Sequence, residues 1–225
     1  MFEADVRFIN EVFDADCISP HQLDRLLADG WRHFGTRFFR YNWAFYELDI
    51  RRVIPLRIRL SDFRLSKSQR RVLRKNEDLA LEIRPISITS ETEALFDRHK
   101  RRFRQSMPDS IYDFVSHQPA TVPCEAREIA VCNSEGEIIA VSYFDIGARC
   151  TSGVYAMFEP SESSRRLGIL TMLKEIEHSI AAGKEFYYQG YSYEGQSFYD
   201  YKKQFAGTEG FDWKGSWSPL TADAQ

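Results

Sequence analysis

The chain has 225 residues, of which 43% are hydrophobic and 14% aromatic, a composition typical of a folded globular protein. Its formal net charge is −3. The sequence contains no run of about 18 apolar residues, so no transmembrane helix is predicted. The residues from Met1 to Asp5 are acidic and lack the basic and apolar regions of a secretory leader. We therefore expect a cytoplasmic protein with no membrane partner.

The first part of the chain predicts a helix followed by extended segments. A Ser-Pro pair at residues 19–20 is typical of the N-cap and first turn of a helix, which is expected to end near Asp29. The aromatic-rich stretch 31–47 is predicted to be extended. Residues 54–60 alternate apolar side chains with Pro and Arg, a period of two that indicates a strand with one apolar and one basic face.

The positive charge of the chain is concentrated between Arg51 and Lys75. This segment holds ten Lys or Arg residues and one acidic residue, Asp62, whereas the rest of the chain holds 20 basic and 32 acidic residues. Ser66 predicts the N-cap of a helix that reaches Asn76. Such a charge distribution favours the docking of a polyanion through its phosphates. The predicted phosphate-binding residues of this segment are Arg57, Arg59, Arg64, Lys67, Arg70, Arg71, Arg74 and Lys75.

The remaining two thirds alternate between predicted strands and helices. A periodic helix from Arg165 to Ala181 carries a stripe of Leu and Ile, and Arg165 and Arg166 at its start are predicted to contact phosphate. From Phe205 onward the chain is aromatic and polar, and its end is expected to be disordered. The other predicted elements are a strand at 79–84, a helix beginning at Ser90, a hairpin of strands 128–132 and 138–144, and strands at 153–158 and 185–189.

This order of elements favours an α/β (α+β) fold of the GNAT acyltransferase type, with a mixed, mostly antiparallel sheet flanked by helices. In that fold, the helix after the fourth strand binds phosphate at its N-terminus. The fourth and fifth strands separate to admit an acceptor amine. We expect residues 1–52 to form a short N-terminal α+β segment and residues 53–225 to form the GNAT-like domain.

Three blocks of sequence together resemble the arginyl/leucyl-tRNA–protein transferases of the N-degron pathway. The longest block, residues 53–76, reads V-I-P-L-R-I and then D-F-R-L-S-K-S-Q-R-R-V-L-R-K-N. The second runs from R-R-L-G to E-I-E over residues 165–177, and the third is Y-Q-G-Y at 188–191 followed by Y-K at 201–202. Their order and spacing match the family over residues 30–205.

The resemblance implies an aminoacyl-tRNA-dependent transferase that moves an amino acid, leucine or arginine, from tRNA to the N-terminal amine of a protein. It implies a GNAT-like catalytic domain in which the basic strand and helix hold the tRNA acceptor arm. The predicted partners are therefore an aminoacyl-tRNA and an acceptor protein, a peptide or a small amine. Which amino acid is donated stays open at this point.

The chain departs from the family at its cysteines. The family usually carries a cysteine cluster just before the I-P-V-R-I strand, where this chain has Glu47, Ile50 and Val53, and often a further cysteine where Gln196 stands. We therefore expect no cofactor, and in particular no iron–sulfur cluster or zinc. The four cysteines are predicted to be reduced, and the five scattered histidines to be surface or packing residues.

Candidate catalytic residues lie between Gln189 and Lys202. An aminoacyl ester is already activated toward an amine, so no covalent nucleophile is required. Gln189 or a backbone N–H group is predicted to hold the oxyanion, a tyrosine to relay a proton to the ribose oxygen, and Glu194 to act as a base. The candidates are Gln189, Tyr191, Tyr193, Glu194, Tyr201 and Lys202.

Three alternatives stay open from the sequence. The first is an ordinary acyl-CoA-dependent N-acyltransferase, although the loop at 165–170 ends in Leu where that class has a small residue. The second is a non-catalytic tRNA-binding relative. The third is aminoacyl-tRNA-dependent transfer to a small molecule or to one dedicated peptide.

Overall fold

The computed structural model describes residues 7–103 and 107–220. Residues 1–5, on which the expectation of no secretory leader rested, lie outside this range. The last five residues, which were expected to be disordered, also lie outside it. The helices are α1 (Pro20–Ala28), α2 (Lys67–Lys75), α3 (Ser90–Lys100) and α4 (Leu167–Ala181), together with 3-10 helices at Leu60–Asp62, Ile111–Asp113, Pro160–Arg165 and Phe198–Gln204.

The strands form a large mixed sheet and a small antiparallel one. Pairing in the nine-stranded sheet follows the order β12-β11-β5-β10-β9-β8-β7-β6, with β4 paired to β5, and the three-stranded sheet has the order β1-β3-β2. The strands are β1 (Asn10–Asp14), β2 (Arg32–Phe34), β3 (Arg37–Tyr41), β4 (Trp43–Tyr46), β5 (Asp49–Arg59), β6 (Ala80–Pro85), β7 (Ala126–Cys132), β8 (Ile138–Ile146), β9 (Cys150–Phe158), β10 (Phe186–Tyr193), β11 (Thr208–Phe211) and β12 (Trp217–Pro219).

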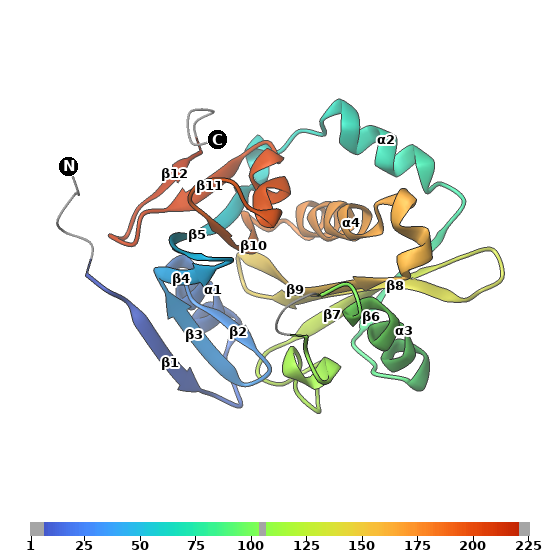
Figure 1. Cartoon of the computed structure of the whole chain (residues 1–225), viewed down its shortest axis with the longest axis horizontal. Coiled ribbons are helices and arrows are strands. Elements are labelled where there is room, and N and C mark those ends of the chain that lie inside the picture. Colours follow the sequence, from blue (N-terminus) through green and yellow to red (C-terminus); the bar gives the residue numbers. More distant parts are fainter. Residues whose placement is uncertain (1–6, 104–106, 221–225) are drawn as a thin grey trace.

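Helices cover both faces of the large sheet (Figure 1). Because side chains alternate along a strand, β8 sends Ala140 and Phe144 to the face covered by α4, and Val141 and Tyr143 to the face covered by α3. The first core also contains Val72 of α2. Two hydrophobic cores therefore share one sheet between them.

The N-terminal segment packs against this sheet through a third core. Leu23 and Leu27 of α1 lie with Phe38 of β3 against Cys150 and Tyr188 of the large sheet. In Figure 1 the small sheet lies beside the part of the large sheet that contains β9 and β10. The boundary expected after residue 52 falls within β5, whose strand runs without interruption from the β4 hairpin into the large sheet.

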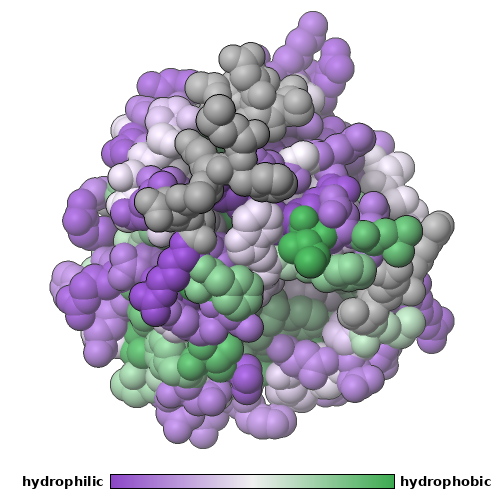
Figure 2. Space-filling model, turned by 60° about the vertical axis from the view of Figure 1, so that its left-hand side comes forward, coloured by the Kyte–Doolittle hydropathy of each residue, from purple (hydrophilic) through white to green (hydrophobic). Residues whose placement is uncertain are grey.

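The β4–β5 hairpin carries exposed apolar side chains. Phe45, Leu48 and Ile50 are 71%, 95% and 65% exposed. Figure 2 views the side that carries this hairpin and shows several separate hydrophobic patches on an otherwise hydrophilic surface. Among the described residues, no helix is both long and apolar enough to cross a membrane.

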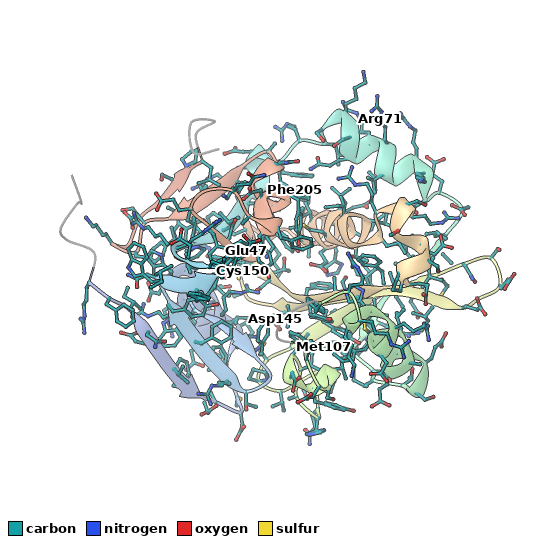
Figure 3. The ribbon with its side chains drawn as sticks, in the orientation of Figure 1. Glu47, Arg71, Met107, Asp145, Cys150 and Phe205 are labelled. Carbon is teal, nitrogen blue, oxygen red and sulfur yellow. The ribbon has the colours of Figure 1, made fainter. Side chains whose placement is uncertain are left out.

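The predicted GNAT-like fold class is confirmed, and the differences are local. All four predicted helices are present, with the N-caps Ser19 and Ser66 each accepting a hydrogen bond from the backbone three residues ahead. The aromatic and polar tail contributes residues 208–211 and 217–219 to the large sheet as β11 and β12, and Phe205, labelled in Figure 3, is buried. The periodic helix begins at Leu167, since Arg166 adopts a left-handed conformation with φ 58.

Candidate functional site

Strands β9 and β10 separate after a short parallel pairing. They are paired only from Phe186 with Cys150 to Tyr188 with Ser152, and this is the one parallel contact among the described strands. On its other side, β10 shifts its register with β5 between Tyr188 and Gly190, where Gly190 has φ 89. A register shift of this kind bends the strand, so the later residues of β10 turn away from β9. The sheet is therefore open between the ends of the two strands.

Arg32 of β2 lies at the start of this opening. Its guanidinium donates hydrogen bonds to the Ser152 hydroxyl and to the Gly153 carbonyl oxygen, and the residue is 8% exposed. Burial lowers the pKa of Arg32, while the nearby Asp145 carboxylate opposes that effect. A cationic side chain from the small sheet is therefore hydrogen-bonded to β9 at the point where its pairing with β10 ends.

A buried carboxyl group faces the same place from α4. Glu175 is 3% exposed, its Oε2 accepts a hydrogen bond of 2.5 Å from the Tyr187 hydroxyl, and burial raises its pKa to about 7. A Cβ atom at Gly153 would lie 2.7 Å from the Tyr187 hydroxyl and 3.0 Å from Glu175 Oε2. Only a glycine at position 153 therefore lets the Glu175 carboxyl group and the Tyr187 hydroxyl approach the β9 backbone.

Glu175 is absent from the residues predicted above, although the sequence carries a signal for it. Thr171, Glu175 and Ser179 follow one another at intervals of four, and all three are buried at 1%, 3% and 0% exposure. Polar residues at this spacing share one face of a helix. This row of polar residues on the buried side of the otherwise apolar helix α4 is the pattern that indicates Glu175.

Two of the predicted catalytic residues lie together at the bend of β10. The Lys202 ammonium donates to the Tyr191 carbonyl oxygen at 3.2 Å, and Gln189 Nε2 donates to the Lys202 carbonyl oxygen at 3.0 Å. Burial, and then the positive charge of Arg32, lower the pKa of Lys202 to about 7. A Cβ atom at Gly190 would lie 3.3 Å from Lys202 Nζ and 3.8 Å from Arg32 Nε, so both cations converge on this glycine.

The other predicted catalytic residues occupy packing or peripheral positions. The Tyr191 hydroxyl donates to the Gly30 carbonyl oxygen at 2.6 Å, and Tyr193 packs against Tyr46 with ring centroids 4.6 Å apart. Tyr201 packs against the core under α4. Glu194 lines an open pocket beside the β4–β5 hairpin, together with Trp43, Asp49, Ile50, Arg51, Arg52, Gly195 and Gln196.

That pocket also explains the positions at which the family carries cysteines. Ile50 and Gln196 are 146 positions apart in the chain and line the same pocket. Val53 is fully buried on β5, and Glu47 begins the hairpin turn with φ 55. Two of the four positions therefore share one surface, where this chain offers no sulfur ligand.

Helix α2 presents a row of exposed cations. Lys67, Arg70, Arg71, Arg74 and Lys75 are all exposed, while Val72 and Gln69 form the buried side. Within the described residues none of these five cations has a carboxylate partner, and Arg71 points away from the body of the molecule in Figure 3. Such unpaired charges at a surface favour an anionic ligand.

The C-terminal end of α2 adjoins the start of α4. Lys75 Nζ donates to the Ser164 carbonyl oxygen at 2.8 Å, and Asn76 Nδ2 donates to the Arg165 carbonyl oxygen at 3.0 Å. Arg166 is exposed at the N-cap of α4. Lys75 and Arg165 are 90 positions apart in the sequence and are in contact. The basic regions of α2 and of the start of α4 therefore form one continuous surface.

Three predicted phosphate-binding arginines are paired with carboxylates instead. Arg57 is 8% exposed, donates to Glu209 at 2.7 Å and lies between the rings of Phe186 and Trp217. This burial contradicts its predicted contact with phosphate. The side chains of Glu209, Phe186 and Trp217, from strands of the same sheet, cover Arg57 on the face of β5 that the alternation suggested to be basic and open. Arg59 shares Glu209 as a partner. Arg165 is held by Asp78 and Glu162, whereas Arg64 is exposed.

Comparison with known proteins identifies the family. The sequence profile described as "Arginine-tRNA-protein transferase, C terminus" matches residues 91–212, more than half of the chain. An aspartate/glutamate leucyltransferase of Xanthomonas euvesicatoria pv. vesicatoria is 28% identical over 185 residues, which cover 77% of this chain and 72% of the relative. One from Nitrobacter winogradskyi is 30% identical over 165 residues, covering 69% and 64%.

A solved structure shares the fold. The GCN5-related glucosamine N-acetyltransferase region of a fungal multi-domain GH3 β-N-acetylglucosaminidase superposes with a TM-score of 0.50 at 12% identity, over 75% of this chain and 20% of that chain. The second and third sequence blocks, at residues 165–177 and 188–202, lie within the matched range. The chain belongs to the arginine-tRNA-protein transferase family.

Proposed function

We propose that this protein transfers leucine from leucyl-tRNA to the N-terminal amine of proteins that begin with aspartate or glutamate. Membership in the arginine-tRNA-protein transferase family supports the transfer of an amino acid from tRNA to a protein. Leucine and the acidic acceptors are suggested by relatives named aspartate/glutamate leucyltransferase. The structural observation that carries the proposal is the opening between β9 and β10, bordered by Arg32, Glu175 and Lys202.

The opening supplies the proton acceptor that the reaction needs. The acceptor ammonium must lose a proton before its nitrogen attacks, and Lys202, with its pKa near 7, is partly neutral at neutral pH and can take that proton. The nitrogen then forms an amide bond with the ester carbonyl carbon, and the bond from that carbon to the ribose oxygen breaks. The ribose oxygen takes the second proton that the nitrogen releases. This balance requires no covalent intermediate and no cofactor.

We assign the neighbouring groups by their hydrogen bonds. Gln189 fixes the backbone of Lys202 through its Nε2, which makes it a positioning residue, and backbone N–H groups of the separated strands hold the oxyanion. We assign the relay of the second proton to the ribose oxygen to Tyr187 and Glu175, since the Tyr191 hydroxyl is already hydrogen-bonded to the Gly30 carbonyl oxygen. The charge of Arg32 favours an acceptor whose first side chain is a carboxylate.

The tRNA acceptor arm is proposed to lie across α2 and the start of α4. The exposed residues that would contact phosphates are Arg64, Lys67, Arg70, Arg71, Arg74, Lys75 and Arg166. Because Lys75 contacts the loop that precedes α4, an acceptor arm on α2 is led toward the N-terminus of that helix. A tRNA substrate and the four free cysteines also support a cytoplasmic location.

The test supplies leucyl-tRNA and arginyl-tRNA, each labelled on the amino acid, together with peptides that begin with Asp, Glu, Lys, Arg or Ala. We expect transfer from leucyl-tRNA to the Asp and Glu peptides. The Lys202→Met variant should be slower by about 10²–10⁴-fold, and Lys214→Met, which removes an exposed lysine elsewhere, should match the parent. No transfer from any donor would contradict the proposal, and arginine transfer would correct the donor alone.

An acyl-CoA donor fits the structure less well. Leu170, which stands where that class needs a small residue, is buried in the core of α4. Calorimetric titration with acetyl-CoA should show no binding at micromolar concentration. Adding free amines to the transfer assay tests the remaining alternative, a small-molecule acceptor, because labelled product of low mass would then replace labelled peptide.

A further inference from the structure

Three side chains with metal-binding atoms converge at the junction of the two sheets. They are His33 of β2, Cys124 in the segment before β7, and Asp145 of β8, and their ligand atoms all lie within 4.8 Å of one another. The three residues are 5%, 4% and 2% exposed. Asp145 lies at the centre of the molecule in Figure 3, where the small sheet meets β8. The cluster is therefore enclosed by protein on all sides.

The hydrogen bonds of His33 prepare its second nitrogen for a cation. Its Nδ1 lies 2.8 Å from the Gly35 carbonyl oxygen, which can only accept, so Nδ1 carries the hydrogen. In a neutral ring, Nε2 then has a lone pair, and it faces Asp145 Oδ2 at 2.9 Å. Two acceptors cannot hydrogen-bond to each other, so a proton or a metal ion must lie between them. Metal-binding histidines usually donate their other ring N–H to such a carbonyl group.

The third atom of the cluster favours a metal ion over a proton. A carboxylate and an imidazole need only a proton, but the Cys124 sulfur converges on the same point. A set of one imidazole nitrogen, one thiolate and one carboxylate oxygen suits zinc and leaves a fourth position for water. Phe38 stacks on the His33 ring with centroids 4.8 Å apart, which fixes its orientation.

We propose that His33, Cys124 and Asp145 form a zinc-binding site that joins the N-terminal sheet to the catalytic sheet. Arg32, the residue before His33, bonds to Ser152 and Gly153 at the opening between β9 and β10. A metal ion at His33 would hold β2 in place and thereby fix Arg32. This inference departs from the expectation of a metal-free protein, which rested on the vacant cysteine positions of the family and on the scattered cysteines and histidines. It does not depend on the proposed donor or acceptor.

The test measures metal in the full-length protein purified without chelators. We expect about one zinc ion per chain after dialysis, measured by inductively coupled plasma mass spectrometry. After removal of zinc, added Co²⁺ should give a thiolate-to-cobalt charge-transfer absorption and the visible bands of a four-coordinate site. Cys124→Ser should lose the charge-transfer absorption, and Asp145→Asn should weaken Co²⁺ binding by about 100-fold or more.

The matched control is Cys132→Ser, which removes a half-buried thiol that is not part of the cluster and should leave zinc content and cobalt spectrum unchanged. Near-ultraviolet circular dichroism of each protein verifies the fold. A folded parent protein that contains no zinc and gives no cobalt spectrum would overturn the proposal. The same spectrum in Cys124→Ser as in the parent would overturn the assignment of the ligands.

Discussion

Two glycines determine how closely the reactive side chains approach the separated strands. Gly153 leaves room for Tyr187 and Glu175, and Gly190 leaves room for Lys202 and Arg32. Burial moves the pKa values of Glu175 and Lys202 toward 7 from opposite directions. Perturbed groups that converge in this way are typical of functional sites.

The pH dependence of transfer tests Lys202. Because its pKa is lowered to about 7, the fraction of neutral amine rises as the pH increases through 7, and we expect kcat/KM for the peptide to rise with it. The Lys202→Met variant should lose this rise along with most of its activity. A rise near pH 7 that persists in the variant would assign the titration to another group.

The stability of Glu175→Gln tests the buried carboxyl group. The folded pKa of Glu175 is raised from 4.5 to about 7, so the folded state binds more protons than the unfolded state between these values, and stability falls as the pH rises through this window. The variant lacks this loss. Above pH 7 its free energy of unfolding should exceed that of the parent by about 2–3 kcal/mol relative to their difference at pH 4, measured by urea denaturation. Equal pH slopes would show that Glu175 titrates normally.

At the scale of elements, α2 is a charged helix held in place by a few contacts. Its buried side is limited to Gln69 and Val72, and the side chain of Asn76 ties its C-terminal end to Arg165. Among the described residues, the exposed cations of this helix have no carboxylate partner, so their charge is not neutralised within the protein. This arrangement explains why a strongly basic helix is kept in an acidic protein.

Replacing Arg70, Arg71 and Arg74 by alanine should weaken tRNA binding and reduce the slope of log K against log salt by about 2–3. A control that removes the same charge from exposed residues elsewhere should change the slope little; its substitutions are Arg25→Ala, Arg37→Ala and Lys214→Ala. Filter binding over a salt series measures both. Equal slopes in the two variants would remove the role given to α2.

At the scale of the whole molecule, the N-terminal segment packs against the opening proposed as the active site. It supplies Arg32 to the opening and α1 to the third core, and the Trp217 indole of β12 donates back to the Ala28 carbonyl oxygen at 2.8 Å. The N-terminal helix α1 and the late strand β12 are therefore in contact. We infer that the small sheet and the large sheet form one folding unit.

A chain that begins at Asp49 tests this unity. Removing α1 and β1–β4 uncovers Cys150 and Tyr188 of the third core and leaves Ser152 without Arg32. We expect a poorly soluble protein without a cooperative thermal transition, measured by circular dichroism and binding of a hydrophobic dye. A truncated chain with a sharp transition and native near-ultraviolet spectrum would show that residues 49–225 fold alone.

Periodicity and capping in the sequence determined the helices, the central strands and the GNAT-like order, because these signals are local. The charge count located α2, and three blocks of residues indicated the family. Only the tertiary structure decided that Arg57 pairs with Glu209 of β11, that Glu175 and Arg32 reach the opening, and that His33, Cys124 and Asp145 meet. These outcomes depend on contacts between residues up to about 150 positions apart, as for Arg57 and Glu209, and no local pattern encodes such a distance.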